Sequence, residues 1–364
     1  MSERLNYNAA AHFESARTLT SLPETHPSGR MHGHSFLAKV STILPVGWAS
    51  FPGDEVDALR LKLNQVVTPL DYNLLNREIE DPSNENIAHW IRAHLEVPGI
   101  ESIGVQIGSQ EGAELDKAGH THLWKRYRFE SAHQLPNVSA GHKCGRMHGH
   151  GFEVILHADK GDGNNHTSLT YEDLDTLWVP FFKELDHACL NDIPGLQNPT
   201  SEVISSWLWN RLKPLLPELT WVTVYETASC GAHFDGINYR IWKEMTFDSA
   251  VKFNRAPKGD VRRQIHGHTY TLRLHLHAPL DQIMGWTVDF GDVKLLFDPV
   301  FIQLDHNPLH EIAEIKNADT GSIVCWIREQ TASLLPELDR IDLFETPGCG
   351  VVLNWGNGGP VLPV

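Results

Sequence analysis

The chain has 364 residues, of which 41% are hydrophobic and 21% are charged, as in ordinary globular proteins. Its net charge of −16 disfavours nucleic acid or an anionic membrane surface as a partner, but it leaves room for a small anionic substrate. No signal peptide or membrane span is expected, and the five cysteines form no C-x-x-C pair, so we expect a cytoplasmic protein. The unusual count is that of histidine, 22 in all, which raises the question of metal binding.

Three internal repeats organise the chain. Each contains Phe-Glu-Ser-Ala or Phe-Asp-Ser-Ala, starting at Phe13, Phe129 and Phe247, and a His-Gly-His triplet begins 19 residues later in every copy. A Leu-Asp-aromatic triplet follows, with its Asp 38 or 39 residues after the first His. These markers recur at a period of 115 to 119 residues, which indicates tandem triplication. We place the units at residues 1–118, 119–240 and 241–364.

Each repeat predicts the same series of elements. The Phe-Glu-Ser-Ala segment and the run after the triplet alternate polar and apolar residues, which predicts two antiparallel strands. Amphipathic stretches such as 171–185 and 201–216 predict two helices, and segments such as 220–227 and 236–244 predict a closing strand pair. The order β-β-α-α-β-β predicts an α+β unit with both helices on one face of a four-stranded sheet. Three such sheets joined edge to edge in a ring would protect the exposed edges.

The middle unit carries histidines in a pattern typical of a metal site. Residues i and i+2 of a strand project from the same face, so His148 and His150 point together. His133 follows Ser-Ala on the neighbouring strand, where antiparallel pairing would bring it opposite them. Three neutral imidazoles and one open position are what a catalytic zinc site requires. The other units carry Arg17 and Val251 at the position of His133, and neither side chain replaces an imidazole on zinc.

A cysteine precedes the triplet only in the middle unit. Cys144 stands where the other units have Ser28 and Arg262. A thiol near a dication and Lys143 or Arg146 should have a lowered pKa and act as a base or nucleophile. The alternative interpretation is an inert small hydrophobic residue.

Further acid and base candidates lie in the rest of each unit. The Leu-Asp-aromatic triplet offers a carboxylate beside an imidazole in two units, as Asp186-His187 and Asp305-His306, whereas the first unit has a tyrosine in place of the histidine. A glutamate in the penultimate strand, Glu226 in the middle unit, could accept two parallel hydrogen bonds from a guanine-like or pterin-like ring.

The equivalent of this glutamate is Glu345 in the third unit. In the first unit, spacing leaves either Ser109 or Glu111 as the equivalent.

Taken together, these residues resemble the 6-pyruvoyl-tetrahydropterin synthase / 6-carboxytetrahydropterin synthase family. The resemblance runs the length of the middle unit and lies in five features: FESAH at 129–133, C-x3-HGH at 144–150, LDHACLN at 185–191, NPTSE at 198–202, and the strand glutamate. It implies the tunnelling fold, with three units in a trimer-like ring around a β-barrel core. Because a family member usually supplies one unit per chain, this chain resembles a covalent trimer, and a homodimer of two stacked rings would mimic the family's hexamer.

The resemblance also implies an activity. The substrate would be the pterin triphosphate 7,8-dihydroneopterin triphosphate, with Zn²⁺ on His133, His148 and His150 acting on the side-chain hydroxyls. Cys144 would move protons at the adjacent carbons. Glu226 would anchor the pterin ring, lined by the region of Thr200.

Two details of the resemblance sharpen the prediction. The C-x3-HGH spacing resembles the 6-carboxytetrahydropterin branch of the deazapurine (queuosine) pathway, whereas the pyruvoyl branch is the alternative product. In the family, the cysteine and the Asp-His pair come from neighbouring subunits. We therefore expect Asp305 and His306 to serve Cys144, with Asp186 and His187 as the fallback.

Two other interpretations compete with this one. A cupin-like metal oxygenase also uses His-x-His, but the nearby Glu153 faces away from both ligands in strand alternation. A non-catalytic pterin- or purine-binding protein is the other, since two units have lost functional positions.

Overall fold

A computed structural model describes residues 3–160, 169–315, 317–356, 358–360 and 362–363. Unit 1 consists of β1 (Arg4–Arg17), β2 (His32–Thr42), α1 (Glu55–Val67), β3 (Asn73–Leu74), α2 (Asn84–His94), β4 (Ile100–Ile107) and β5 (Glu111–Asp116). Unit 2 consists of β6 (Thr121–His133), β7 (His148–Asp159), α3 (Tyr171–Leu185), β8 (Ala188–Cys189), α4 (Ser201–Leu212), β9 (Leu219–Thr227) and β10 (Cys230–Phe234). Unit 3 consists of β11 (Tyr239–Val251), β12 (His266–His277), α5 (Phe290–Leu304), α6 (Thr320–Thr331), β13 (Leu338–Thr346) and β14 (Cys349–Asn354).

The long strands of the three units form one closed barrel. Within each unit, four antiparallel strands pair in sequence, and the last strand of a unit pairs with the first strand of the next, β5 with β6 and β10 with β11. The barrel closes where β14 pairs with β1, with Arg4 opposite Asn354 and Asn8 opposite Gly350. Because every sheet edge is paired in this way, the predicted ring of three α+β units is confirmed.

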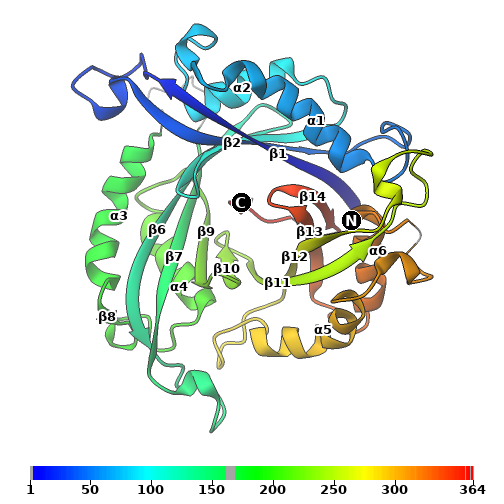
Figure 1. The fold of residues 1–364 in the computed structure, drawn as a ribbon. Coiled ribbons are helices and arrows are strands. Elements are labelled where there is room, and N and C mark those ends of the chain that lie inside the picture. Colours follow the sequence, from blue (N-terminus) through cyan, green and yellow to red (C-terminus); the bar gives the residue numbers. More distant parts are fainter. Residues whose placement is uncertain (1–2, 161–168, 316, 357, 361, 364) are drawn as a thin grey trace.

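The helices lie on the outside of the barrel (Figure 1). Each unit buries an apolar cluster between its helix pair and its part of the sheet. A stacked pair of rings recurs in these clusters just beyond the triplet, as Phe13–Phe36, Phe129–Phe152 and Phe247–Tyr270, with centroids 5.0, 5.2 and 5.0 Å apart. The repeated sequence pattern therefore produces the same packing three times.

Helix α4 is shorter than the sequence pattern predicts. The amphipathic pattern runs to residue 216, but the helix ends at Leu212. Pro214 follows the C-cap residue Lys213, and proline provides no N–H to continue the helix. The predicted helix is present, and it ends four residues earlier than the sequence pattern indicates.

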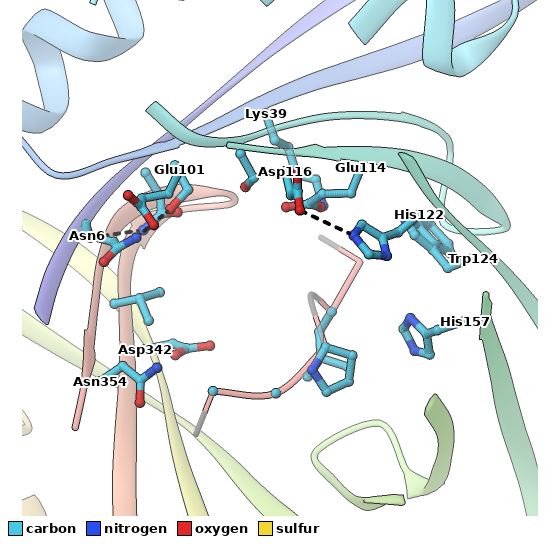
Figure 2. A pocket seen from close by; sticks show the side chains of 18 of the residues that line it. Asn6, Lys39, Glu101, Glu114, Asp116, His122, Trp124, His157, Asp342 and Asn354 are labelled. Carbon is cyan, nitrogen blue, oxygen red and sulfur yellow. Dashed lines mark hydrogen bonds and ion pairs between the residues drawn. The ribbon is translucent and has the colours of Figure 1, made fainter. Parts of the chain in front are cut away.

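The C-terminal segment enters the lumen of the barrel (Figure 1). A cavity of about 510 Å³ remains there, and Gly358, Gly359, Pro360 and Leu362 form part of its wall. Figure 2 shows side chains of all three units facing this space, including Lys39, His157 and Asp342. The lumen is thus lined by both polar and apolar side chains and partly filled by the C-terminal segment.

In the described part of the chain, no helix combines the length and the apolar character needed to cross a bilayer.

Candidate active site

The three histidines of unit 2 converge as the sequence predicts. The register of β6 and β7 sets His133 directly opposite His148. The centroid of the His133 ring lies 4.5 Å from that of His148 and 5.1 Å from that of His150. One ligand atom from each histidine and one from Glu226 all lie within 4.8 Å of one another. This distance suits a single bound ion.

The orientation of the imidazoles also fits a metal. The Nδ1 atoms of His133 and His148 lie 3.0 Å from Pro199 O and 2.7 Å from Arg146 O. These carbonyl contacts fix the tautomer and leave Nε2 free as the ligand atom. The Nε2 atoms of His133 and His150 are buried and have no hydrogen-bond partner in the described residues. Burial lowers the pKa of His133 to about 4 and also lowers that of His150, so both rings are neutral, as metal ligation requires.

Cys144 lies half-buried in the loop that leads into β7. It sits in a single turn of 3-10 helix, Lys143–Gly145, and the side chain of His142 caps this turn by accepting a hydrogen bond from the Cys144 N–H at 3.2 Å. Burial and the negative charge of Glu226 raise the pKa of the thiol, and Lys143 opposes them. Among the protein groups, burial and Glu226 outweigh Lys143, so the lowered thiol pKa that the sequence predicts beside a dication does not come from the lysine.

Glu226 lies between the histidines and the start of α4. Its carboxylate is 3.6 Å from His150 Nε2 and accepts a hydrogen bond of 3.1 Å from Ser201 Oγ. Thr200 is the N-cap of α4, accepting from the Val203 N–H, and its hydroxyl donates to Gly285 O. Thr200 thus positions the helix terminus, and the residue that contacts Glu226 is its neighbour Ser201. Sequence reasoning missed Ser201, although a residue directly after a helix cap is a detectable signal.

Unit 3 covers this site with a segment that the sequence analysis did not identify. Asn137 and Asn198 of unit 2 donate from Nδ2 to Ile283 O and Met284 O, at 2.5 and 2.7 Å. The Thr287 N–H donates to the Glu202 carboxylate at 2.8 Å. The segment from residue 283 to residue 289 therefore forms one wall of the unit 2 site. The site lies at a boundary between units.

The two Asp-His pairs are exposed at one end of the barrel. His187 and His306 have positive φ of 56° and side chains that are 80% and 76% exposed. In each pair, Nδ1 of the histidine contacts the adjacent aspartate, at 2.7 and 2.9 Å. His187 lies just after α3 and His306 just after α5. Each donates its backbone N–H to the first strand of its own unit, at Glu130 O and Asp248 O.

Asp305 and His306 therefore contact the first strand of their own unit. A different segment of unit 3, residues 283–289, reaches the loop of Cys144.

Unit 1 has a cation at the position of the third histidine. Arg17 is opposite His32 in the strand register and is buried. Its Nη1 donates to Pro82 O at 3.0 Å and to Asn84 Oδ1 at 2.9 Å. Pro82 O corresponds to the carbonyl that contacts His133 Nδ1 in unit 2. A guanidinium therefore fills the space that the imidazole occupies in unit 2.

The strand register also identifies the unit 1 counterpart of Glu226. Leu37 is opposite Gln106, and the corresponding residue of β7, Glu153, is opposite Tyr225, so the residues that follow in β4 and β9, Ile107 and Glu226, correspond. The counterpart is therefore Ile107, and neither Ser109 nor Glu111, the two residues that spacing left open, occupies this position. Counting failed because unit 1 is shorter before this position, with 36 residues from Asp71 to Ile107 against 40 from Asp186 to Glu226.

Unit 3 keeps the glutamate but loses the metal set. Glu345 accepts a hydrogen bond of 2.7 Å from Thr320 Oγ1, and burial raises its pKa to about 7. Val251 at the third histidine position is fully buried. Arg262, at the position of Cys144, extends across to unit 1, where Nη1 contacts Asp54 at 2.6 Å and Asp57 at 2.8 Å.

The fold is a ring of three β-β-α-α-β-β repeats, and one boundary between repeats combines three imidazoles, a thiol and a carboxylate. The family model described as 6-pyruvoyl tetrahydropterin synthase matches the chain three times, over residues 7–108, 122–236 and 240–355. The chain belongs to this family of enzymes, and the predicted resemblance with three tandem units is confirmed.

Individual relatives match one unit of the chain. A 6-carboxy-5,6,7,8-tetrahydropterin synthase from Synechocystis sp. is 36% identical over 119 residues, which are 31% of this chain and 91% of that protein. A dihydroneopterin monophosphate aldolase from Pyrococcus furiosus is 33% identical over 119 residues, or 32% of this chain and 97% of that protein. The solved structure of Caenorhabditis elegans 6-pyruvoyl tetrahydropterin synthase is 18% identical with a TM-score of 0.29, covering 32% of this chain and 95% of that one.

Proposed function

We propose that the chain is a zinc-dependent 6-carboxy-5,6,7,8-tetrahydropterin synthase that acts on 7,8-dihydroneopterin triphosphate in the cytoplasm, in the deazapurine pathway. The observation that carries this proposal is the cluster of His133, His148, His150 and Glu226, with Cys144 in the adjoining loop. The C-x3-HGH spacing and the name of the Synechocystis relative favour the carboxy product over the alternative pyruvoyl product.

The residues of unit 2 have separate roles in this proposal. Zn²⁺ held by the three histidines would supply a positive charge that makes the substrate's side-chain hydroxyls more acidic. Cys144, as the thiolate, would accept a proton from an adjacent carbon and, as the thiol so formed, return it. Glu226 accepts hydrogen bonds from the N–H and NH2 edge of the pterin ring, and Ser201 holds the carboxylate in place.

An Asp-His pair assists the proton transfers. Both pairs lie at the barrel end that carries the metal ligands, because β8 pairs with Ser131 and Ala132, next to His133, and Pro308 bridges to Ala250 in unit 3. A second ring stacked on this end would bring exposed pairs to the site, which supports a homodimer of covalent pseudo-trimers. We propose Asp305 and His306 as the pair that serves Cys144, with Asp186 and His187 as the fallback.

The three units have different roles in this proposal. Residues 119–240 form the catalytic unit, residues 1–118 a unit without a metal set, and residues 241–364 a unit that supplies the Asp-His pair. This division is supported by Arg17 and Val251, which stand where a third imidazole is needed. We expect one zinc ion and one working site per chain.

A product assay tests the activity. Zinc-loaded protein is incubated with 7,8-dihydroneopterin triphosphate and the products are identified by mass, with Cys144→Ala as the inactive control. The 6-carboxy product supports the proposal, and a pyruvoyl product supports the alternative. Binding of the pterin without turnover, in wild-type protein with full zinc, would indicate a non-catalytic pterin-binding protein. Dihydroneopterin monophosphate is included because the Pyrococcus relative is named for it.

Two single variants test the assignment of the Asp-His pair. We expect His306→Ala to abolish turnover and His187→Ala to retain it. The opposite result would show that the pair of unit 2 does the work.

A further inference from the structure

The backbone of Cys144 is held by two hydrogen bonds. Its C=O accepts from the Leu135 N–H at 2.8 Å, and its N–H donates to the Nδ1 atom of His142 at 3.2 Å. The first bond belongs to the unit's own strand end, whereas the second depends on the orientation of one imidazole ring. The position of the thiol therefore follows the position of the His142 side chain.

A residue of unit 3 faces the other side of this ring. His142 Nε2 lies 3.6 Å from Asp289 Oδ2, and the two side chains are 28% and 21% exposed. Because Nδ1 accepts a hydrogen bond, the neutral ring carries its proton on Nε2, the nitrogen that faces the carboxylate. Asp289 is itself fixed as the N-cap of α5, accepting from the Gly291 N–H at 2.6 Å. A helix terminus of unit 3 thus lies against the ring that caps Cys144.

We propose that His142 and Asp289 form a positioning pair by which unit 3 sets the place of the Cys144 thiol. This inference rests on the proposed function, since it assigns Cys144 a catalytic role. His142 acts through the backbone of Cys144 and Asp289 acts through His142. The interaction gives unit 3 a role at the unit 2 site that does not depend on its Asp-His pair.

Unit 1 contains the same arrangement without a thiol. His26 Nδ1 accepts from the Ser28 N–H at 3.1 Å, and His26 Nε2 lies 3.6 Å from Glu172 Oε1 of unit 2. If His142 had only a structural role, replacing it would have the same effect on activity as replacing His26. The chain therefore provides a matched control for every measurement on His142.

The test combines steady-state kinetics with hydrogen exchange on the zinc-loaded full chain. We expect His142→Ala to lower kcat about tenfold with little change in KM, because the thiol is displaced while the ring-binding residues stay in place. Exchange of the peptide that contains residues 142–145 should become faster. Asp289→Asn, which keeps an N-cap residue for α5, should change both quantities in the same direction.

His26→Ala should speed exchange in residues 26–29 and leave kcat unchanged. The proposal is overturned if His142→Ala keeps full kcat, or if His26→Ala lowers kcat as much. Full kcat and unchanged exchange in Asp289→Asn would remove Asp289 from the pair and overturn the role of unit 3.

Exchange is measured without substrate, so it separates this proposal from the proposed function. If the wild-type enzyme converts none of the pterins offered, the proposed activity fails. Faster exchange at residues 142–145 in Asp289→Asn would then still support control of the loop by unit 3, and unchanged exchange would overturn it.

Discussion

Glu202 is a carboxylate of unit 2 that accepts hydrogen bonds from unit 3. It is 2% exposed and receives the N–H and hydroxyl of Thr287 at 2.8 and 3.2 Å. Burial raises its pKa from 4.5 to about 7, with a further contribution from the charge of Glu226. The folded protein therefore binds this proton more tightly than the unfolded chain, and stability falls as pH rises from about 4.5 to about 7.

We predict that Glu202→Gln removes this pH dependence. Glutamine keeps an acceptor for Thr287 and carries no charge, so the variant should match the wild-type protein near pH 4.5. Above pH 7 it should be more stable, by roughly 3 kcal/mol at most. Chemical denaturation at both pH values measures the difference in free energy of unfolding. The exposed residue Glu218 provides the control, and equal effects of Glu218→Gln and Glu202→Gln would contradict the prediction.

At the scale of elements, strand pairs β1–β2 and β6–β7 have the same register. Arg17 is opposite His32 as His133 is opposite His148, and His34 corresponds to His150. We predict that Arg17→His creates a second metal site, because the new imidazole would face Pro82 O as His133 faces Pro199 O. Zinc content should rise from about one to about two ions per chain, with three imidazoles per site.

Activity should not rise with the second ion. Ser28 stands at the position of the thiol and Ile107 at that of Glu226, so unit 1 would hold metal without the thiol and the carboxylate. Elemental analysis of the dialysed protein gives the stoichiometry. His133→Ala is the reciprocal control and should lose the single ion. An unchanged zinc content in Arg17→His would show that the strand register does not suffice to build the site.

Some features of the elements and of the site could be predicted from the sequence, and others could not. Repeat spacing predicts the order of elements and the place of His133, because strand alternation and antiparallel pairing are local rules. The covering segment at 283–289 escapes prediction because it depends on contacts between units. The role of Ser201 escapes because it depends on how the start of α4 packs against Glu226. The counterpart of Glu226 in unit 1 escapes as well. Counting along the chain misses that unit 1 is shorter between Asp71 and β4, whereas the opposite strand residue, Phe36, identifies Ile107 directly.

At the scale of the whole molecule, the chain's own end stabilises the barrel from inside. Leu362 is 4% exposed and belongs to an apolar cluster in the lumen with Trp124, Ile155, Tyr225 and Trp242. These residues come from units 2 and 3, so the tail connects separate parts of the ring. We predict that Leu362→Ala lowers the free energy of unfolding by about 2–3 kcal/mol, measured by denaturant titration. The exposed residue Leu215 provides the control, and an equal loss in Leu215→Ala would contradict a specific role of the tail.

The ring has one boundary without a covalent link. Units 1 and 2 are joined through residues 117–120 and units 2 and 3 through residues 235–238, whereas β14 and β1 meet only by pairing. Arg262 lies at this boundary, with Asp54 and Asp57 of unit 1 on Nη1 and Asp260 on Nη2 at 2.8 Å. Its guanidinium also lies over the Phe51 ring, 4.7 Å from the centroid. The residue of unit 3 at the position of Cys144 therefore helps to close the ring.

We predict that Arg262→Ala loosens this boundary selectively. The side chain is 21% exposed and has three carboxylate partners, so its loss should lower the free energy of unfolding by about 1–3 kcal/mol. Hydrogen exchange should become faster in β1 and β14 and stay unchanged in β5 and β6, which a linker holds together. Because released strand edges pair with other chains, light scattering should detect larger species at high concentration. Arg128, 63% exposed and paired with Glu130 on its own strand, provides the control. Uniformly faster exchange in all strands would show that Arg262 stabilises unit 3 generally and does not close the ring.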